Sequence, residues 1–404
     1  MAARNRRREV VVGLFWLIAV TVDSVQARRN RILSDGSNDA EFAKPPRGTL
    51  KTIQGGGGDV VDCVDIYQQL AFDHPLLKNH TIQMKPSFFQ EQEGESHQPS
   101  QGQPGLEEWG VDCPEGTIPI IRKTSKNHPD VKDYAPSFPF DIESNRSIKS
   151  FKHEYAYVIA AGDLGSFHGA QARLNVWNPQ IEDYEFSAAK IWIIGGPTAS
   201  ADVVEAGWIV GDNFEPKRAP RLFTYWTSDG YQSTGCYDLQ CPGFVQTNKI
   251  FPLGSIIPSS TFNGKQTELY IEIKQDISTG NWWLRVKNVD LGYWPGLIFS
   301  SLRLGARSII WGGEITNGIK NGQHTTTQMG SGHFPRDGYY TKSAYIRNIG
   351  YIKHDDPMQP TPKEDLQTYV TNRQCYDLVL GPSNLNFGTH FYFGGPGRSA
   401  QCPK

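Results

Sequence analysis

The sequence predicts an all-β protein, an antiparallel β-sandwich preceded by a small disulfide-containing unit. Three observations support this. Many short segments alternate apolar and polar residues, as strands with one buried face do. The chain is rich in turn formers, with 41 Gly and 26 Pro, and 12% of its residues are aromatic. One stretch alone, "WPGLIFSSLRLGA" at 294–306, is a clear helix candidate.

The chain begins with the pattern of a secretory signal. A basic head, "MAARNRRREV", precedes a short apolar run at 10–22 and a plausible cleavage position after Ala27. The run is shorter than the about 18 residues of a spanning helix. We therefore expect 1–27 to be a signal peptide rather than an uncleaved anchor, and the mature chain to be secreted, soluble and free of the membrane. Sequons at Asn79 and Asn145 fit glycosylation on this route.

Composition divides the rest of the chain into four parts. Residues 28–58 are polar and end in "QGGGGD", which predicts a flexible segment. A small cysteine-bearing unit is expected at 59–125, and a polar, proline-bearing linker at 126–150. Strand patterns dominate 151–404. We expect the sandwich to be built from this last part.

The six cysteines favour disulfides, because their number is even and the chain carries a secretory signal. A zinc site is disfavoured, since the sequence has no CxxC and no histidine pair at ligand spacing. Proximity along the chain favours two pairs and leaves a third. The predicted pairs are Cys236–Cys241, Cys375–Cys402 and Cys63–Cys113.

Strand patterns recur through the second part of the chain. The segments "LYIEIKQ" and "WWLRVKN" flank the glycine-bearing turn "DISTGN", which is a hairpin signal. Further strand-like segments carry Trp, Ile and Tyr between Gly and Asp turns, as in a sandwich. They are "ARLNVWN", "AKIWIIGG", "RLFTYWTSDGY" and "SAYIRNIGYIK".

Most standard catalytic signatures are missing from the sequence. It contains no HExxH, no GxSxG, no P-loop and no dinucleotide fingerprint. The net charge of −2 without a basic stripe gives no sign of nucleic-acid binding. His324 and His333 are nine residues apart in a polar segment, and we expect them to be structural. We expect no cofactor and no metal, and the paired cysteines leave no thiol nucleophile.

Two glutamates stand in unusual settings. Glu205 in "ADVVEAGWIVGD" and Glu314 in "SIIWGGEITNG" both lie in apolar, glycine-flanked segments that carry Trp. Burying a carboxylate there is costly unless it has a partner or a role. Two close carboxylates do not both ionise easily, so such a pair supplies an acid and a base together. We interpret the two glycines before Glu314 as room for a substrate backbone.

The chain resembles the plant neprosin family of glutamic peptidases over nearly its whole length after the signal. The resemblance implies that 59–125 is an activation peptide, that 126–150 holds a processing site, and that 151–404 is the catalytic β-sandwich. A Gln/Ser/Gly insert around "EGESHQPSQGQPGLEEWG" departs from the family pattern. The motifs that carry the resemblance are "CVDIYQQLAFDHPLLKNHTIQMKPS", "WGVDCPEGTIPIIR", "EAGWIV", "RLFTYWTSDGYQSTGCYDLQCPGF", "GYWPGLIF", "WGGEITN" and "HTTTQMGSGHFP".

The resemblance also implies a mechanism. Glu205 and Glu314 form the catalytic dyad, and water attacks the peptide carbonyl with no covalent intermediate. By analogy with fungal glutamic peptidases, Glu314 is the base and Glu205, protonated, binds the oxyanion. Cleavage after proline at acidic pH is implied, so the expected partners are proline-containing peptides and the chain's own activation peptide. We expect a monomer, secreted to the apoplast or cell wall.

Activation and an alternative function complete the expectations. The linker carries Pro129, Pro136 and Pro139, so a latent zymogen could cut itself there, or a separate protease could cut at "RKTSK". The alternative is a non-catalytic, secreted cell-wall or glycan-binding β-sandwich. Its sugar platform would be formed by Trp226, Tyr231, Trp282, Trp283 and Trp294.

Overall fold

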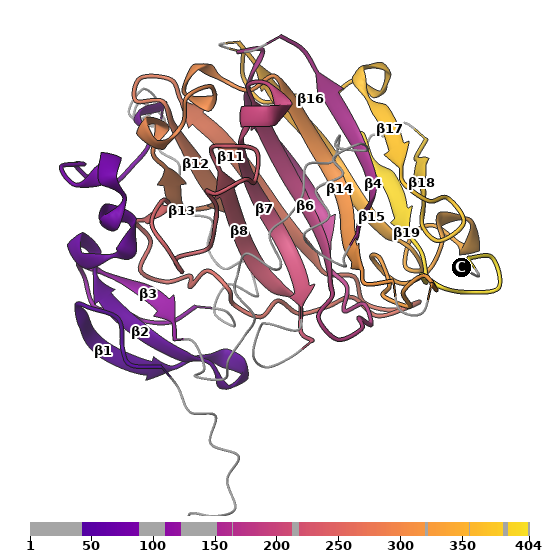
Figure 1. Cartoon of the computed structure of the whole chain (residues 1–404), viewed down its shortest axis with the longest axis horizontal. Coiled ribbons are helices and arrows are strands. Elements are labelled where there is room, and N and C mark those ends of the chain that lie inside the picture. The colour runs from indigo at the N-terminus through magenta and orange to yellow at the C-terminus, as the bar shows by residue number, and fades with distance from the viewer. Residues whose placement is uncertain are drawn as a thin grey trace, which may run out of the picture. The chain divides into compact units, whose positions relative to one another are not determined.

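The computed structural model describes residues 43–88, 110–122, 152–163, 165–211, 218–319, 322–354, 356–382 and 387–402. These residues form three antiparallel sheets joined by loops and single turns of 3-10 helix (Figure 1), which confirms the all-β prediction. The expected signal peptide at 1–27, the linker at 126–150 and Asn145 lie outside the described residues. No helix among the described residues is long and apolar enough to cross a membrane.

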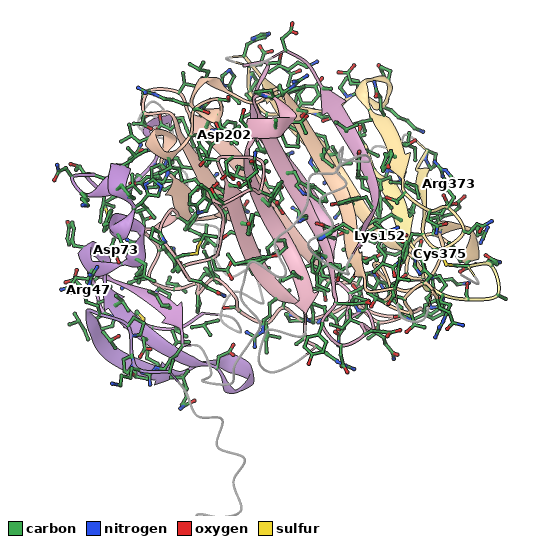
Figure 2. All side chains as sticks on the ribbon, viewed as in Figure 1. Arg47, Asp73, Lys152, Asp202, Arg373 and Cys375 are labelled. Carbon is green, nitrogen blue, oxygen red and sulfur yellow. A yellow bond between two sulfur atoms is a disulfide. The ribbon has the colours of Figure 1, made fainter. Side chains whose placement is uncertain are left out.

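A small three-stranded sheet belongs to the N-terminal region, with its strands in the order β1-β2-β3. Residues 49–54, which we expected within a flexible segment, form its first strand and pair with the buried second strand. A disulfide joins Cys63 to Cys113, and an exposed ion pair joins Arg47 to Asp73 at 3.0 Å (Figure 2). The strands are β1 (Thr49–Gln54), β2 (Val60–Asp65) and β3 (Thr117–Ile121).

The seven-stranded sheet holds the three strands that matter most for the site. Strands β6, β7 and β14 are its centre, and every one of their residues is buried, so both faces of these strands are covered. The order of the sheet is β17-β4-β14-β6-β7-β8-β9. The strands are β4 (Lys152–Ala161), β6 (Phe186–Gly195), β7 (Asp202–Gly211), β8 (Arg221–Thr227), β9 (Cys236–Tyr237), β14 (Ser308–Asn317) and β17 (Gln367–Val370).

The nine-stranded sheet forms the second layer. Its order is β10-β13-β12-β11-β5-β15-β19-β18, with β16 paired to β15. The predicted hairpin is present, because β11 pairs with β12 through the "DISTGN" turn. The strands are β5 (Phe167–Asn175), β10 (Val245–Gln246), β11 (Glu268–Asp276), β12 (Asn281–Val286), β13 (Val289–Trp294), β15 (Ala344–Lys353), β16 (Gln359–Pro360), β18 (Asp377–Leu380) and β19 (Phe391–Gly394).

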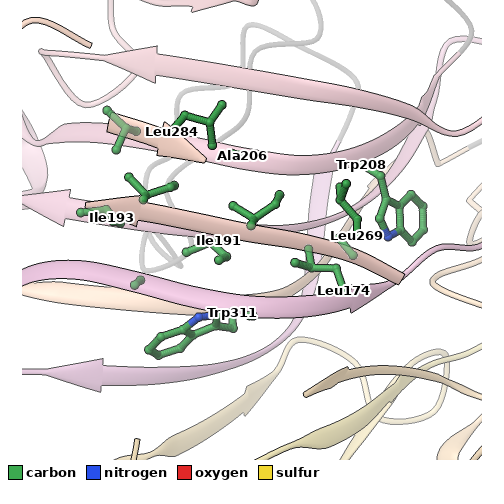
Figure 3. Packing of buried hydrophobic residues seen from close by; sticks show 14 of the residues in the cluster. Leu174, Ile191, Ile193, Ala206, Trp208, Leu269, Leu284 and Trp311 are labelled. Carbon is green, nitrogen blue, oxygen red and sulfur yellow. The ribbon is translucent and has the colours of Figure 1, made fainter. Parts of the chain in front are cut away.

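The hydrophobic core lies between the two large sheets. Alternate residues of β6 and β7, such as Ile191 and Trp208, pack against residues of β5 and β11, such as Leu174 and Leu269 (Figure 3). The indole N–H of Trp208 donates to the Asn175 carbonyl at 3.1 Å, so a β7 side chain bonds a β5 backbone across the core. This core fixes which face of each central strand points inward.

The predicted helix at 294–306 is wrong. Trp294 ends β13, and the stretch then makes two separate 3-10 turns, η8 and η9. Pro295 and Gly305 bound this segment, and neither supports a continuous helix. Among the described residues the 3-10 turns are η1 (Gly56–Gly58), η2 (Ile66–Gln68), η3 (Leu70–Asp73), η4 (Pro75–Leu77), η7 (Thr198–Ser200), η8 (Gly296–Ile298), η9 (Leu302–Leu304), η10 (Pro335–Asp337) and η11 (Lys363–Asp365).

The cysteines and the large aromatic residues can now be placed. The structure forms the remaining two predicted disulfides, Cys236–Cys241 and Cys375–Cys402. The four tryptophans of the predicted sugar platform are each at most 4% exposed and pack in the interior, so they form no exposed platform. They are Trp226, Trp282, Trp283 and Trp294. Tyr231 is partly exposed and faces the site described next.

Candidate active site

Three adjacent strands bring Glu205, Glu314 and Lys190 together. Glu205 is on β7, opposite Trp192 of β6, and Glu314 is on β14, opposite Ala188 of β6. Lys190 lies midway between those two β6 positions. Side chains two residues apart share a face of a strand. All three therefore lie on the face of the sheet that points away from the interlayer core, to which the neighbouring Ala189 and Ile191 belong.

The lysine bridges the two carboxylates. Lys190 Nζ lies 2.5 Å from Glu205 Oε2 and 2.5 Å from Glu314 Oε2. The first contact is a hydrogen bond, whereas Glu314 Oε2 has an ion pair without hydrogen-bond geometry. The side chains are 1%, 0% and 0% exposed for Lys190, Glu205 and Glu314. The two predicted residues thus meet, and they meet through a cation.

Sequence reasoning missed Lys190, although the sequence contained a clue. Lys190 stands in "FSAAKIWIIGG", an apolar run that forms a strand buried on both faces. The argument that singled out Glu205 and Glu314, a charge in an apolar strand, applies equally to this lysine. We had searched for carboxylates and did not apply the argument to cations.

Each glutamate has a second polar partner of its own. His153 Nδ1 donates to Glu314 Oε1 at 2.7 Å from the edge of β4. The Tyr231 hydroxyl donates to Glu205 Oε1 at 2.6 Å from the loop after β8. The two glutamates therefore have different second partners, an imidazole for Glu314 and a phenol for Glu205.

The surroundings separate the pKa values of the two glutamates. Burial raises the pKa of Glu205 above its usual range, and the charge of Lys190 offsets this only in part. Burial also acts to raise the pKa of Glu314, but the Lys190 charge and the His153 hydrogen bond outweigh it and lower the pKa to about 2. Burial disfavours the charged form of Lys190, yet the two carboxylates outweigh it and raise the pKa of the ammonium.

Glycines occupy the strand positions beside the lysine and before Glu314. The cross-strand neighbours of Lys190 are Gly207 on β7 and Gly312 on β14. A Cβ on Gly207 would lie 2.6 Å from the Lys190 Cβ. Gly313 points the other way, where a Cβ would lie 2.6 Å from the Phe393 ring. Packing within the sheet and against β19 accounts for both glycines before Glu314, and a role for them in substrate approach stays a prediction.

Aromatic clusters flank the charged groups on the same face. One contains Tyr155, Tyr157 and Trp192 with the half-buried Tyr369. The other contains Phe186, Phe223, Tyr225 and Tyr237, and Tyr231 packs against both. The Lys190 ammonium lies 4.6 Å from the centroid of the Trp192 ring. The site is therefore an ionic cluster in apolar walls, where electrostatic interactions are stronger than in water.

The predicted structural role of the histidines fits their contacts. His324 Nε2 bonds Glu154 Oε1 at 2.8 Å, and its other nitrogen bonds the Thr325 carbonyl. The His333 ring is 44% exposed and lies 4.0 Å from Asp337. His324 also lies near the sulfurs of Cys375 and Cys402, but these form a disulfide and are not free to ligate a metal.

A second set of buried carboxylates lies at the end of the same sheet, and we call it the distal cluster. Glu185 accepts hydrogen bonds from Gly318 N at 2.8 Å, from Thr325 Oγ1 at 2.6 Å and from Thr327 Oγ1. Glu154 Oε1 accepts from Asn317 at 2.8 Å as well as contacting His324. The distal cluster consists of Glu154, Glu185, Asn317, His324, Thr325 and Thr327.

Comparison with known families agrees with this organisation. The Neprosin family model matches residues 183–396, more than half of the chain, and the Neprosin activation peptide model matches 52–159. The chain belongs to the Neprosin family. It is thus a peptidase that carries its own activation peptide. The Neprosin match contains Lys190, Glu205 and Glu314, which we call the bridged cluster.

Among the solved structures that match the chain is scytalido-glutamic peptidase with a peptide-based transition state analog. The likeness has a TM-score of 0.36 and 12% identity, and covers 60% of this chain and 98% of that chain. SCP-B, a member of the Eqolisin family of peptidases in complex with the tripeptide Ala-Ile-His, matches with a TM-score of 0.34 and 12% identity over the same shares.

The activation peptide region of this Neprosin chain packs closely on the sandwich. Arg221 of β8 donates to both carboxylate oxygens of Asp59, each at 3.0 Å, and both side chains are nearly buried. Gln69 and Gln246 exchange two hydrogen bonds, at 3.1 and 2.9 Å. Val64 and other apolar residues of the activation region belong to the same hydrophobic cluster as the interlayer core.

Two further sandwich residues receive the activation region. The Tyr293 hydroxyl accepts from Gln83 N at 3.0 Å and bonds His80 Nε2 at 2.7 Å. The Asp276 carboxylate accepts from Gln83 Nε2 at 2.6 Å and from Ser87 N at 2.8 Å. These contacts contain titratable groups, so their strength depends on pH.

Proposed function

We propose that this chain is an endopeptidase that hydrolyses peptide bonds with a dyad of Glu205 and Glu314. The observation that carries the proposal is the buried site in which both carboxylates meet on one face of three adjacent strands, with their pKa values moved in opposite directions. A pair of carboxyl groups with separated pKa values is what acid–base hydrolysis needs.

The surroundings support distinct roles for the two glutamates. Glu314 faces Lys190 and His153, which favour its ionised form, so it is suited to remove a proton from water. Glu205 keeps its proton to higher pH, so it is suited to hydrogen-bond the developing oxyanion. On collapse of the tetrahedral intermediate, the proton taken by Glu314 passes to the leaving amine, and no covalent enzyme intermediate forms.

The finer features of the proposal rest on the family resemblance. We propose cleavage after proline, an acidic optimum, and secretion to the apoplast or cell wall as a monomer. The acidic optimum is supported by the singly protonated state that the two glutamates favour at low pH. The proline preference calls for a direct test.

We propose that the chain is made as a latent zymogen. Both glutamates are 0% exposed in the full-length chain, so a substrate has no access to them in this state. The activation peptide region is tied to the sandwich through Arg221, Gln246, Tyr293 and Asp276. Activation of the enzyme could therefore be controlled at the step in which these contacts are released.

Acidification would weaken two of these contacts. Tyr293 accepts a hydrogen bond from Gln83 N–H, and its hydroxyl can donate to His80 Nε2 only while that nitrogen carries no proton. Burial lowers the pKa of His80, so the stability from its neutral form is present above the unfolded pKa and is lost as pH falls through the folded pKa. Burial alone would raise the pKa of Asp276, but hydrogen bonds from Ser87 and others lower it, so this contact is also lost in acid.

The test of activity is a digest of a mixed peptide library by purified protein at several pH values, read by mass spectrometry. We expect cleavage at acidic pH with proline on the amino side of the cut bond. Chelators and serine- or cysteine-directed reagents should leave the activity unchanged. Cleavage without a proline preference would contradict the proposed specificity. If the mature protein cleaves no peptide, the proposed activity is wrong.

The test of latency is the N-terminus of the mature form after acid treatment of wild type and of Glu314→Ala. If the enzyme processes itself, wild type should be cut near Pro129, Pro136 or Pro139, and the variant should remain full length. A variant that matures normally in a purified preparation would show that another protease makes the cut.

A glycan-binding function receives no support from the site. The tryptophans expected to form its platform are buried. A sugar stacks on exposed aromatic rings, and the ionic cluster provides none. A binding assay on cell-wall polysaccharide beside the peptide digest would separate the two functions.

A further inference from the structure

Lys190 is the one residue of the bridged cluster that the proposed dyad mechanism does not use. Its Nζ touches both carboxylates at 2.5 Å, and its side chain is 1% exposed. Its cross-strand neighbour on β7 is Gly207, where a Cβ would lie 2.6 Å from the Lys190 Cβ. A fully buried lysine is rare unless it is paired, so this one calls for an explanation.

The charge of the cluster explains that role. With one glutamate protonated, the carboxylate and the ammonium cancel, and the buried cluster is neutral. With both glutamates ionised it carries an excess negative charge, and with both protonated an unpaired positive charge. A low-dielectric site favours the neutral state. The lysine thus stabilises the singly protonated dyad, which is the state that acid–base catalysis needs.

The other titratable groups facing the cluster do not supply this charge. They include His153, Tyr155 and Tyr157 from β4, Tyr225 from β8, Tyr237 from β9 and Tyr231 from the loop after β8. Burial raises the pKa of Tyr157, Tyr225, Tyr231 and Tyr237, so these phenols stay neutral. His153 bonds Glu314 alone among the two glutamates, and its side chain is 15% exposed to solvent. Lys190 is the cation that both carboxylates share.

We propose that Lys190 is a positioning residue of the reaction, whose ammonium group holds the dyad in its singly protonated form at acidic pH and keeps Glu314 ionised as the base. The proposal rests on the proposed function, because it concerns the same two glutamates. His153 bonds Glu314 and adds to the lysine in favouring its ionised form, whereas at Glu205 burial outweighs the hydrogen bond from Tyr231, so Glu205 carries the proton.

The test is the pH profile of kcat/KM for the mature enzyme and its Lys190→Met and Lys190→Gln variants. Loss of a positive charge at this distance should raise the pKa of the base, so the acidic limb should move up by about 1–3 pH units. KM should change little, because the lysine acts on the dyad and not on the substrate. Lys190→Arg should keep most of the wild-type limb, because it keeps the charge. Lys353→Met, which removes a surface lysine paired with Asp365, is the matched control and should leave the profile unchanged.

A second measurement keeps the proposal testable if the neutral variants do not fold. Infrared titration of the wild-type protein should show a carboxylate that stays ionised at unusually low pH and that disappears in Glu314→Gln. An ordinary titration of this group with Lys190 in place would overturn the proposal. So would a folded Lys190→Met enzyme that loses activity equally at all pH values, since that is a structural effect.

Failure of the dyad itself would look different. If Glu314→Gln keeps wild-type turnover, the proposed function is wrong, whatever Lys190 does. If Glu314→Gln is inactive and the acidic limb of folded Lys190→Met stays in place, the dyad stands and the role of the lysine is wrong.

Discussion

The seven-stranded sheet buries two pairs of carboxylates, and their partners differ. In the distal cluster, Glu185 accepts hydrogen bonds from two hydroxyls and a backbone amide, all of them neutral donors within the fold. In the bridged cluster, Glu205 and Glu314 share one lysine. The Glu314 oxygen that faces the lysine has no hydrogen bond among the described residues.

This difference separates a structural acid from a reactive one. A carboxylate whose lone pairs are all occupied by fixed neutral donors is held in place and has little left to offer a substrate. Glu314 is held instead by a charged partner that keeps it ionised, so it is available as a proton acceptor over a wide range of pH. Burial alone therefore does not mark a candidate catalytic glutamate. Within the described part of the chain, Glu154 of the distal cluster also pairs with an imidazole and has an oxygen without a hydrogen bond, so the feature that sets the bridged cluster apart is one lysine shared by two carboxylates.

The largest expected effect is on catalysis. Glu314→Gln should reduce kcat by about 10²–10⁴-fold, the usual contribution of a general base. Glu205→Ala and Glu314→Ala should likewise remove most activity with the fold retained. Steady-state kinetics on a proline-containing peptide checks this, and Glu185→Gln is the matched control. If Glu314→Gln and Glu185→Gln lower kcat equally, the proposed difference between the two clusters is wrong.

The pH dependence of activity should follow the bridged cluster. The lowered pKa of Glu314, about 2, sets the acidic limb, because protonation removes the base. The raised pKa of Glu205 sets the upper limb, because ionisation removes the acid. The profile of kcat/KM should be bell-shaped on the acid side and fall about tenfold per pH unit beyond its limbs. An optimum at or above neutral pH would contradict the dyad.

The distal cluster should contribute to stability and leave catalysis unchanged. Glu185→Gln replaces an acceptor by an amide that presents N–H groups to the donors around it. The expected loss is about 1–3 kcal/mol in the free energy of unfolding. Urea denaturation of the mature protein measures it, with kcat/KM as the second readout. Unchanged stability would mean that the fold does not need these hydrogen bonds.

Replacing Glu205 should increase the stability of the protein at higher pH, in contrast to the loss of stability expected for Glu185→Gln. Its pKa is raised in the folded state, so the stability that it contributes is present below the unfolded pKa and is lost as pH rises through the folded value. Glu205→Gln has no such loss. The free energy of unfolding of the variant should therefore rise relative to that of wild type as pH rises, by about 1.4 kcal/mol for each unit by which the pKa of Glu205 is raised. Denaturation at a series of pH values tests this, and a constant difference would refute it.

Much of the fold could be predicted from the sequence because its signals are local. Alternating segments and glycine turns marked the strands, and the spacing of the cysteines marked the disulfides. The helix predicted at 294–306 failed because apolar content is not periodicity, and proline and glycine divide that stretch into two turns. The strand at 49–54 was missed because its charged and polar residues resemble those of a linker, and its pairing with β2 lies beyond local pattern.

The site could be predicted only in part. The setting of Glu205 and Glu314 in apolar strands marked both residues, but that they meet depends on the order β14-β6-β7, which no local pattern encodes. Lys190 belongs to the strand that lies between them, so its role follows from the same order. His153 and Tyr231 come from separate segments and carried no signal of their own.

The register of strands β6, β7 and β14 limits which insertions and deletions the sequence can tolerate. Lys190, Glu205 and Glu314 meet because each occupies an outward position of an alternating strand, and their neighbours in sequence fill the core. A one-residue insertion or deletion within β6, β7 or β14 would exchange the two faces beyond that point. Such a change would place charges between the layers and apolar side chains in the site. Length changes in these strands should therefore be eliminated by selection, whereas the loops that join them are free to change in length.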